Sequence, residues 1–524
     1  MRAAKAKPDI NGQRVRCARR QADLAALPGE LYSSAQLRQI DQRAIAAGTA
    51  GIVLMRRAAA AALHETLQRW PSVKKILVLC GSGNNGGDGY LFARLAAQRG
   101  LDLMVVELGE SRSADASTAR KALLADGLQP LAWQALSDHH LSGCELVVDA
   151  LLGTGLSGPP RAAYADAIAA INRAGRPVVA LDIPSGLCSD SGCVLGDSAV
   201  AAQLTVSFIG LQRGLFTADA GCHVGELVLA PLGVNSQALL DTQSITKLDK
   251  LEPLLACLPT RSANHYKNRS GHVLVIGGNQ GMAGAVLLAA QAALRAGAGL
   301  VSVATRPAHV PAVVAAQPEI MAHGVEGVDD LQSLLQRASA VLIGPGLGQD
   351  SWARQMLLAC RSIKQPLVLD ADGLNLAAQT PALLPAAPAV FTPHPGEAAR
   401  LAAPIENFKQ ADRFALATAL AQHYRKTIVL KGPGTITADA AQSWLCAYGN
   451  QALATGGTGD VLGGIIAALL AQGLAPALAA RLAVCLHGAA ADQWVAKHGP
   501  YGMLAGDLPL ELVALLNRLA GRGN

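Results

Sequence analysis

Aromatic and charged residues are both scarce in this sequence. Phe, Trp and Tyr make up 3% of the 524 residues, and charged residues make up 16%. So few aromatic side chains argue against a stacking platform for nucleic acid. The ten cysteines form no C-x-x-C pair, and the closest two, Cys188 and Cys193, match no common zinc pattern. We therefore expect reduced, structural thiols in a cytoplasmic protein.

A recognisable signal peptide and an unbroken membrane-spanning run are also missing. Residues 1–30 are rich in Arg and Lys but lack an apolar stretch, so we expect a basic, disordered extension rather than a contact with nucleic acid or membrane. Residues 461–480 carry no charge, but Gln472, Gly473 and Pro476 interrupt them. Two short buried helices are favoured there over a membrane span.

Hydrophobic residues are abundant, at 51% of the chain, and the chain is too long for one core. Apolar runs alternate with Ala-rich helical stretches, first over 31–235 and again over 250–520, with a polar, irregular linker at 236–249. The apolar runs do not alternate with polar residues, which is typical of buried parallel strands. The sequence therefore predicts two α/β domains.

The first domain has a glycine-rich loop, GSGNNGGDG, directly after the apolar run KKILVLC. Gly81, Gly83 and Gly86 fit the G-x-G-x-x-G dinucleotide fingerprint, and Glu107 stands where a ribose-binding acid is expected. A dehydrogenase is one interpretation. The fingerprint does not, however, require the asparagines and the aspartate that crowd this loop.

Further polar residues follow other apolar runs of the same domain. The glycines at 153–158 predict a second anion-binding loop, although tight turns alone would also explain them. Asp149 and Asp182 each end a strand and could be a base, a metal ligand or a helix cap. Together with Asn85 and Ser185, Asp149 offers oxygen ligands that suit a hard cation, which is a weak signal on spacing alone.

Three segments of this domain, VLCGSGNNGGDGYLFARL, VVDALLGTGLSGP and ALDIPSGL, resemble the NAD(P)H-hydrate epimerase family over roughly 31–235. The resemblance implies a Rossmann-like three-layer sandwich that interconverts the R and S epimers of hydrated NAD(P)H at C6. It implies a potassium ion held by Asn85, Asp149 and Ser185, with Asp182 as the acid–base group. It also implies hydrate binding by Asn84, Asn85, Gly86, Gly87, Asp88, Gly153, Thr154, Gly155, Leu156, Ser157, Gly158, Pro159 and Asp182.

The second domain carries a small-residue run, LATGGTGDVLGG at 453–464, that leads into a helical segment with Asp460 near its start. Such a helix start can hold a transferring phosphoryl group while the Asp accepts a proton, or it can simply be a capped helix. KGPGT at 431–435 follows a strand but is not a Walker A loop. TPHPGE at 392–397 supplies His394 and Glu397 without a second zinc ligand at suitable spacing.

GHVLVIGGNQGMAGA, IGPGLG, LDADGLN, TPHPGEAARL, VLKGPGT and TGGTGDVLGG together resemble the NAD(P)H-hydrate dehydratase family over roughly 250–520. The resemblance implies a ribokinase-like domain that phosphorylates the C6 hydroxyl of the S epimer with ADP or ATP and magnesium, then eliminates phosphate. Asp460 would be the base. The hydrate would contact Ala285, Gly346, His394 and Asp460, and the nucleotide would contact Lys431, Gly432, Pro433, Gly434, Thr435 and Gly459.

The sequence departs locally from that family at HYKNRSGH, 265–272, and at Gly373, and it leaves the roles of Asp372 and Asn375 open. We predict a fused repair enzyme that takes NAD(P)H hydrates and ADP, binds neither nucleic acid nor membrane, and forms a homo-oligomer. Two alternatives remain. One is a vitamin-type small-molecule kinase fused to a dinucleotide-binding domain, and the other is a non-catalytic dinucleotide-binding module.

Overall fold

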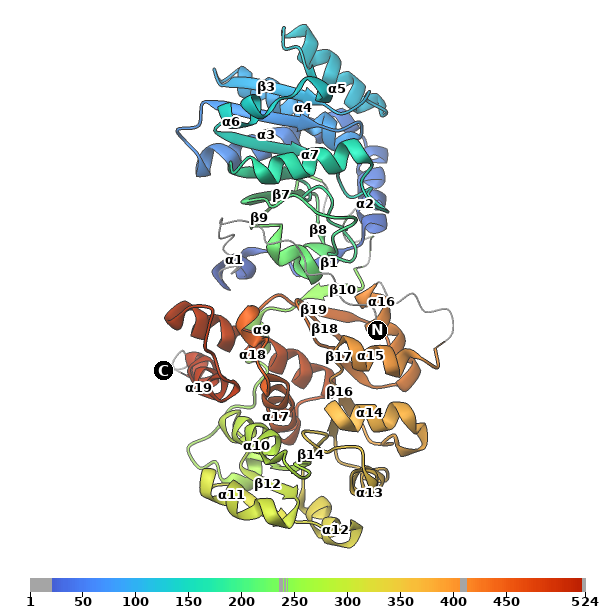
Figure 1. The fold of residues 1–524 in the computed structure, drawn as a ribbon, viewed down its shortest axis with the longest axis vertical. Coiled ribbons are helices and arrows are strands. Elements are labelled where there is room, and N and C mark those ends of the chain that lie inside the picture. Colours follow the sequence, from blue (N-terminus) through green and yellow to red (C-terminus); the bar gives the residue numbers. More distant parts are fainter. Residues whose placement is uncertain (1–20, 235–238, 240–241, 243, 406–411, 521–524) are drawn as a thin grey trace. The chain divides into compact units, whose positions relative to one another are not determined.

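The computed structural model describes residues 21–234, 239, 242, 244–405 and 412–520. The chain divides into two compact units, Met1–Ser244 and Ile245–Asn524 (Figure 1). Strand β10 (Thr246–Leu248) lies in the stretch expected to be linker, and α1 (Gln21–Ala26) lies in the stretch expected to be extension. Residues 1–20, to which the prediction of disorder mainly applies, lie outside the described residues.

The first unit alternates strands and helices, as the sequence predicts. Its strands are β1 (Glu30–Tyr32), β2 (Lys75–Cys80), β3 (Asp102–Glu107), β4 (Leu131–Ala132), β5 (Leu146–Ala150), β6 (Val178–Leu181), β7 (Leu204–Phe208), β8 (Leu211–Gln212) and β9 (Glu226–Ala230). Its other α-helices are α2 (Ser34–Ala46), α3 (Gly51–Arg69), α4 (Asn84–Ala97), α5 (Ala114–Ala125), α6 (Asp138–Gly143) and α7 (Ala162–Arg173). Short 3₁₀ turns are η1 (Trp133–Ala135), η2 (Arg213–Phe216) and η3 (Ala218–Cys222).

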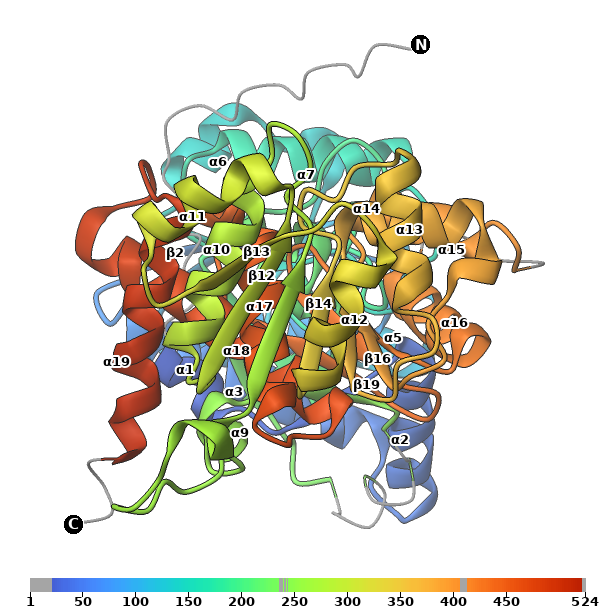
Figure 2. The ribbon, with the colours of Figure 1, turned by 90° about the horizontal axis from the view of Figure 1, so that it is seen from below.

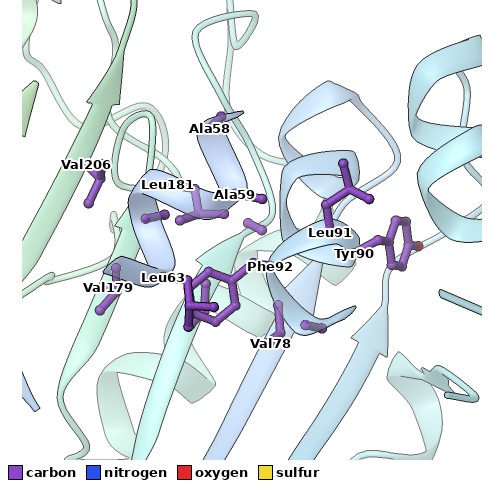
Figure 3. Packing of buried hydrophobic residues seen from close by; sticks show 14 of the residues in the cluster. Ala58, Ala59, Leu63, Val78, Tyr90, Leu91, Phe92, Val179, Leu181 and Val206 are labelled. Atoms are coloured by element: carbon purple, nitrogen blue, oxygen red, sulfur yellow. The ribbon is translucent and has the colours of Figure 1, made fainter. Parts of the chain in front are cut away.

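The main sheet of this unit is parallel, with strand order β4-β3-β2-β5-β6-β7-β9. Successive residues of β2 face opposite sides and both faces are covered, which explains why the strand is apolar after Lys75. Val78 packs with Leu63 of α3 and Phe92 of α4 (Figure 3), whereas Leu77 and Leu79 join the cluster that includes α7. The sheet therefore lies between two helical layers. The strand order reverses between β2 and β5, which is where open α/β sheets bind ligands.

The second unit has a larger sheet. Its remaining strands are β11 (His272–Ile276), β12 (Leu300–Thr305), β13 (Met321–Gly324), β14 (Ala340–Ile343), β15 (Leu367–Leu369), β16 (Ala389–Phe391), β17 (Thr427–Leu430), β18 (Thr435–Ala438) and β19 (Ser443–Cys446). Its α-helices are α9 (Leu251–Leu255), α10 (Ala283–Arg295), α11 (Val310–Ala316), α12 (Val328–Arg337), α13 (Ser351–Ala359), α14 (Ala371–Gln379), α15 (Pro395–Ala402), α16 (Arg413–Tyr424), α17 (Thr458–Ala471), α18 (Pro476–His498) and α19 (Leu508–Ala520). Short 3₁₀ turns are η4 (Lys267–Ser270), η5 (Pro307–His309), η6 (Pro381–Leu383), η7 (Gln451–Leu453) and η8 (Ala505–Asp507).

Strands β13-β12-β11-β14-β15-β16-β17 run parallel, and β18 and β19 continue the sheet in antiparallel fashion. Helices cover both faces: Figure 2 shows α12 in front of the parallel strands and α17 behind them. Helices α10 and α17 pack closely on each other because Gly464 has no side chain. A Cβ atom there would lie 2.1 Å from the carbonyl oxygen of Ala289.

The uncharged stretch 461–480 is divided between α17 and α18. The prediction of two helices is confirmed here, but α18 continues to His498 and spans 23 residues, so it is not short. Among the described residues, no single helix is long and apolar enough to cross a membrane. Helices α2 and α3 pass that test as a pair by length and composition, with a bend of 117° between them.

Candidate active sites

The first site begins where β2 ends. The loop runs through Gly81 and Gly83, and α4 starts at Asn84 with Gly83 as its N-cap. A Cβ atom on Gly86 would lie 1.8 Å from the carbonyl oxygen of Gly81, so only glycine lets the helix start this close to the strand. Apart from its chain neighbours, no atom lies within 4 Å of a Cβ built on Gly83, and both Gly83 and Asn84 are exposed, so the start of this helix is accessible.

Asn85 and Ser185 both bind the backbone of Leu152, and Ser185 also binds Asp149. The side-chain amide of Asn85 donates to the Leu152 carbonyl at 3.0 Å, and the Ser185 hydroxyl oxygen accepts from the Leu152 N–H at 2.9 Å. Ser185 Oγ also donates to Asp149 Oδ1 at 2.6 Å. Asn85 is buried, yet its Oδ1 has no hydrogen-bond partner among the described residues. A buried amide oxygen without a partner is a ligand that a hard cation could take, whereas the Asp149 oxygens already accept from Ser185 and from the Leu151 N–H.

Asp182 follows β6 with a backbone φ of +66°, a conformation that costs energy and often occurs at functional sites. Its Oδ1 accepts from the amide of Gln212 at 2.7 Å, and its Oδ2 accepts weakly from the N–H of Thr154 at 3.4 Å. A Cβ atom built on Gly153 would lie 3.3 Å from Asp182 Oδ2 and 3.4 Å from Asn85 Cβ. The side chains of Asp182 and Asn85 therefore both approach Gly153. Burial raises the pKa of Asp182 to about 6, and the hydrogen bonds oppose this shift.

The other predicted residues of this site lie on the same two loops. Asn84 is exposed at the start of α4, Gly86 and Gly87 are buried in its first turns, and Asp88 is partly exposed. Burial, followed by the charges of Asp182 and Asp41, raises the pKa of Asp88 well above its usual range. Residues 155–159 of the second loop are exposed or partly exposed.

Glu107, where a ribose-binding acid would stand, is already paired. Its carboxylate accepts two hydrogen bonds from Arg120, at 2.7 Å and 3.0 Å. This pairing counts against the dehydrogenase interpretation. Sequence reasoning missed Gln212, which directly contacts Asp182 from β8.

The second site begins at the first turn of α17. Gly457 forms the N-cap with a φ of +91°, and Asp460 lies in the first turn. The Thr458 hydroxyl donates to the carbonyl oxygens of Leu453 and Thr455, both at 3.0 Å. The Thr458 carbonyl oxygen lies 2.9 Å from Nε2 of buried His487. Burial lowers the pKa of His487 to about 4, so its ring is neutral and Nε2 carries the donated hydrogen.

Lys431 extends from the end of β17 toward this helix start. Its ammonium nitrogen lies 2.9 Å from Asp370 Oδ1. A Cβ atom built on Gly459 would lie 3.6 Å from the same nitrogen. Burial and the charges of Asp370 and Asp372 raise the pKa of Asp460 to about 7, while Lys431 lowers it. This value suits a general base that works near neutral pH.

The loop that follows Lys431 is held by Arg413 of α16. Its guanidinium donates to the carbonyl oxygens of Pro433 and Gly434, at 2.5 Å and 3.2 Å. The Thr435 hydroxyl donates to the Gly432 carbonyl oxygen at 3.0 Å and closes the turn. The predicted nucleotide loop therefore has a fixed shape, and Gly432 and Pro433 are exposed.

The predicted hydrate contacts Ala285 and Gly346 lie together. A Cβ on Gly346 would lie 3.2 Å from the Cβ of Ala285. His394 is exposed at the N-cap of α15, where its Nδ1 accepts from the Gly396 N–H at 3.0 Å. Its Nε2 lies 3.3 Å from Oε1 of buried Glu397, so Glu397 orients the ring.

Two polar residues whose roles the sequence leaves open have structural partners. Asp372 accepts from the backbone N–H of Gly348 at 2.9 Å, and Asn375 accepts from Arg400 at 3.0 Å. In the part of the chain that the structure describes, no group of three or more His, Cys, Asp or Glu side chains could hold a metal ion.

Comparisons with known proteins match both halves of the chain. Residues 51–214 match the family described as YjeF-related protein N-terminus, and residues 273–513 match the NAD(P)H-hydrate dehydratase family. The bifunctional NAD(P)H-hydrate repair enzyme of Coxiella burnetii is 44% identical, over 93% of this chain and 99% of that one. The enzyme of the same name from Escherichia coli is 40% identical, over 88% of this chain and 89% of that one.

The chain belongs to the family of bifunctional NAD(P)H-hydrate repair enzymes. The predicted fold class, a Rossmann-like domain followed by a ribokinase-like domain, is confirmed with it. Among solved structures, the chain is similar to the ADP/ATP-dependent NAD(P)H-hydrate dehydratase of Bacillus subtilis, co-crystallised with ATP and Mg²⁺. That protein is 33% identical over 51% of this chain and 96% of its own length, with a TM-score of 0.45.

Proposed function

We propose that this chain repairs hydrated nicotinamide dinucleotides in two steps. The first unit epimerises the R and S forms of NAD(P)H hydrate at C6, and the second unit dehydrates the S form to NAD(P)H with ADP as phosphate donor. One observation carries the proposal beyond family membership. Each unit has a partly exposed carboxyl group with a raised pKa close to the carboxyl ends of its strands, Asp182 in the first unit and Asp460 in the second, and in the first unit Asp88 of α4 shares this property. Each unit therefore has its own acid–base group.

In the epimerase site, Asp182 is the proposed acid–base residue. Inverting C6 requires the hydroxyl to leave or the ring to open, with electron donation from the ring nitrogen. The Oδ2 atom of Asp182 faces the Gly153–Thr154 loop, where the dinucleotide would lie, and can give and take the proton. The N-terminal turn of α4 supplies N–H groups for the phosphates.

Potassium is the cation proposed for this site. Asn85, Asp149 and Ser185 would hold it, and the unpartnered Oδ1 of Asn85 is the observation that favours this assignment. A bound cation would supply positive charge beside the phosphates and the loop that follows β5.

In the dehydratase site, Asp460 is the proposed base. It accepts the proton of the C6 hydroxyl as that oxygen attacks the terminal phosphorus of ADP, and AMP leaves. Phosphate then leaves C6 with electrons from the ring nitrogen, and loss of a proton from C5 forms the C5–C6 double bond of NAD(P)H. Lys431 and the N-terminal N–H groups of α17 stabilise the negative charge on the transferring phosphoryl group. Magnesium would enter with the nucleotide, coordinated by its phosphate oxygens.

The most direct test supplies purified S hydrate with ADP and follows absorbance of the reduced ring together with release of AMP and phosphate. The proposed reaction produces all three products in equal amounts. A kinase that makes a stable phosphorylated product would consume ADP without growth of that absorbance, and this result would reject the proposal. A homo-oligomer and a cytoplasmic location stay predictions, and light scattering of the purified chain would test the first.

A further inference from the structure

Gln212 is a buried amide with both ends engaged. It lies in the two-residue strand β8 with no exposed surface. Its Nε2 donates to Asp182 Oδ1 at 2.7 Å, and its Oε1 accepts from the hydroxyl of Ser207 at 3.1 Å. The ionised Asp182 carboxylate can only accept, so it selects the Nε2 end of the amide, and the Ser207 hydroxyl, which can donate, supports this orientation at Oε1.

This contact makes the two oxygens of Asp182 different. Oδ1 accepts from Gln212, whereas Oδ2 faces Gly153 and accepts weakly from the Thr154 N–H; the backbone N–H of Phe208 also lowers the pKa of this carboxyl group. The backbone of Asp182 is also held, since its N–H donates to the Val206 carbonyl at 2.8 Å. The strained residue therefore has one side chain orientation, with its freer oxygen toward the loop.

The restraint that Gln212 supplies carries no charge. A neutral amide donor can hold a carboxylate in one orientation without neutralising it, so Asp182 keeps its capacity to take up a proton.

We propose that Gln212 is a positioning residue for epimerisation, which acts through Asp182 by fixing Oδ1 and thereby aiming Oδ2 at the reacting carbon. This inference rests on the proposed function of the first unit. It predicts that Gln212 matters for the rate of the chemical step and little for binding of the hydrate. It also predicts that Gln212 has no effect once Asp182 cannot take part.

A double-mutant cycle in the full chain tests this. Gln212→Met keeps the approximate size of the side chain and removes the donor. We expect kcat for R–S exchange to fall about ten- to a hundredfold, the range for a hydrogen bond to a charged group, with KM nearly unchanged. In an Asp182→Asn background, adding Gln212→Met should cause no further loss. Chromatography that resolves the epimers gives the rates.

Two further variants separate positioning from general damage. Ser207→Ala leaves Gln212 in place but removes the partner that orients its amide, so a smaller fall in kcat is expected, again absent in the Asp182→Asn background. Gln203→Met is the matched control, because Gln203 accepts from the Val178 N–H in the same unit, and it should leave exchange unchanged. Thermal melting of each variant reports folding, and Ser207→Ala decides the question if Gln212→Met does not fold.

The outcomes are distinguishable. If the fall in kcat of the double variant equalled the product of the falls in Gln212→Met and Asp182→Asn, Gln212 would act independently of Asp182. This result would overturn the inference. Exchange at the parent rate in Gln212→Met would also overturn it, while the proposed role of Asp182 would stand. Exchange at the parent rate in Asp182→Asn would remove the acid–base assignment itself, and the inference with it.

Discussion

The ammonium nitrogen of Lys431 lies 2.9 Å from Oδ1 of Asp370, at the point where the loop after β17 approaches the first turn of α17. The Asp370 side chain is only 2% exposed, so the pair is shielded from water on the carboxylate side. The charges of Asp370, Glu397 and Asp460 all raise the pKa of Lys431 and outweigh its burial. Lys431 therefore stays charged near neutral pH. Asp460 is the group of this pair whose protonation changes with pH in that range.

The pH dependence of dehydration should follow from this arrangement. A base works only when ionised, so the rate should fall as pH falls through about 7, the pKa of Asp460. Asp370→Asn removes the charge that raises this pKa most after burial, so the acid limb should move to lower pH. The measurement is kcat/KM against pH for NADH formation from S hydrate, because this ratio reports the pKa of the free enzyme. Asp372→Asn, the weaker of the two influences, should move the limb less, and an upward shift in either variant would contradict the assignment.

The sequence was enough to predict the candidate acid–base residues, but not the residues that contact and position the two sites. Asp182 and Asp460 stand in motifs with a recognisable order of glycines, so both could be named from the sequence alone. Gln212 and His487 could not, because each acts through a contact with a residue about 30 positions away in the chain. Asp370 is 61 positions from Lys431. Such pairs depend on which strands lie side by side in the sheet. The spacing of residues within a short motif contains no information about this.

The same limit applies to the fold. Alternation of apolar and Ala-rich runs predicted the parallel strands, because a strand buried on both faces must be apolar throughout. It did not predict β10, since Thr246–Leu248 has a charged residue at its centre and reads as loop. Pairing with β19 stabilises this strand, and that pairing joins residues nearly 200 positions apart.

Potassium should be needed for epimerisation. Replacing potassium by choline at equal ionic strength should slow R–S exchange, because the cation would complete the coordination of Asn85 Oδ1. In Asn85→Leu, R–S exchange should be slow in both salts, and the rates in potassium and in choline should be equal. Initial rates by chromatography provide the measurement, and sodium is the control for a non-specific monovalent cation. Equal rates of the parent enzyme in potassium and choline would mean that these oxygens bind no functional ion.

ADP should support recovery of NADH better than ATP. The expectation comes from the family resemblance, in which the nucleotide contacts the loop that includes exposed Gly432 and Pro433. The measurement is kcat/KM for each nucleotide with saturating S hydrate and magnesium. A ratio that favours ATP would change the donor assignment, but the reaction and the role of Asp460 would be unaffected.

The close packing of α10 against α17 at Gly464 should make the stability of the protein sensitive to substitution there. Gly464→Ala would place a methyl group 2.1 Å from the carbonyl oxygen of Ala289, so the helices must separate. Overpacking of this kind costs about 1–3 kcal/mol, and the melting temperature should fall. Gly284→Ala on α10 is the matched control, because no atom lies within 4 Å of its Cβ. There the better helix propensity of Ala should leave the melting temperature unchanged or slightly higher.

The two activities should be separable by single substitutions. Asp460→Asn keeps the size of the side chain but cannot accept the hydroxyl proton, so dehydration should fall by about 10²–10⁴-fold, the range for one acid–base group. R–S exchange should continue at the parent rate, because Asp182 and its partners all belong to the first unit.

A mixed sample of the two epimers reveals both activities at once. The parent enzyme should convert all of it to NADH when ADP is supplied. Asp182→Asn should consume the S form quickly and leave the R form to its slow spontaneous exchange, whereas Asp460→Asn should leave both forms in equilibrium. Chromatography over time distinguishes these three courses. If Asp460→Asn also stopped exchange of the epimers, the two units could not be independent catalysts, and the assignment of one acid–base group to each would be wrong.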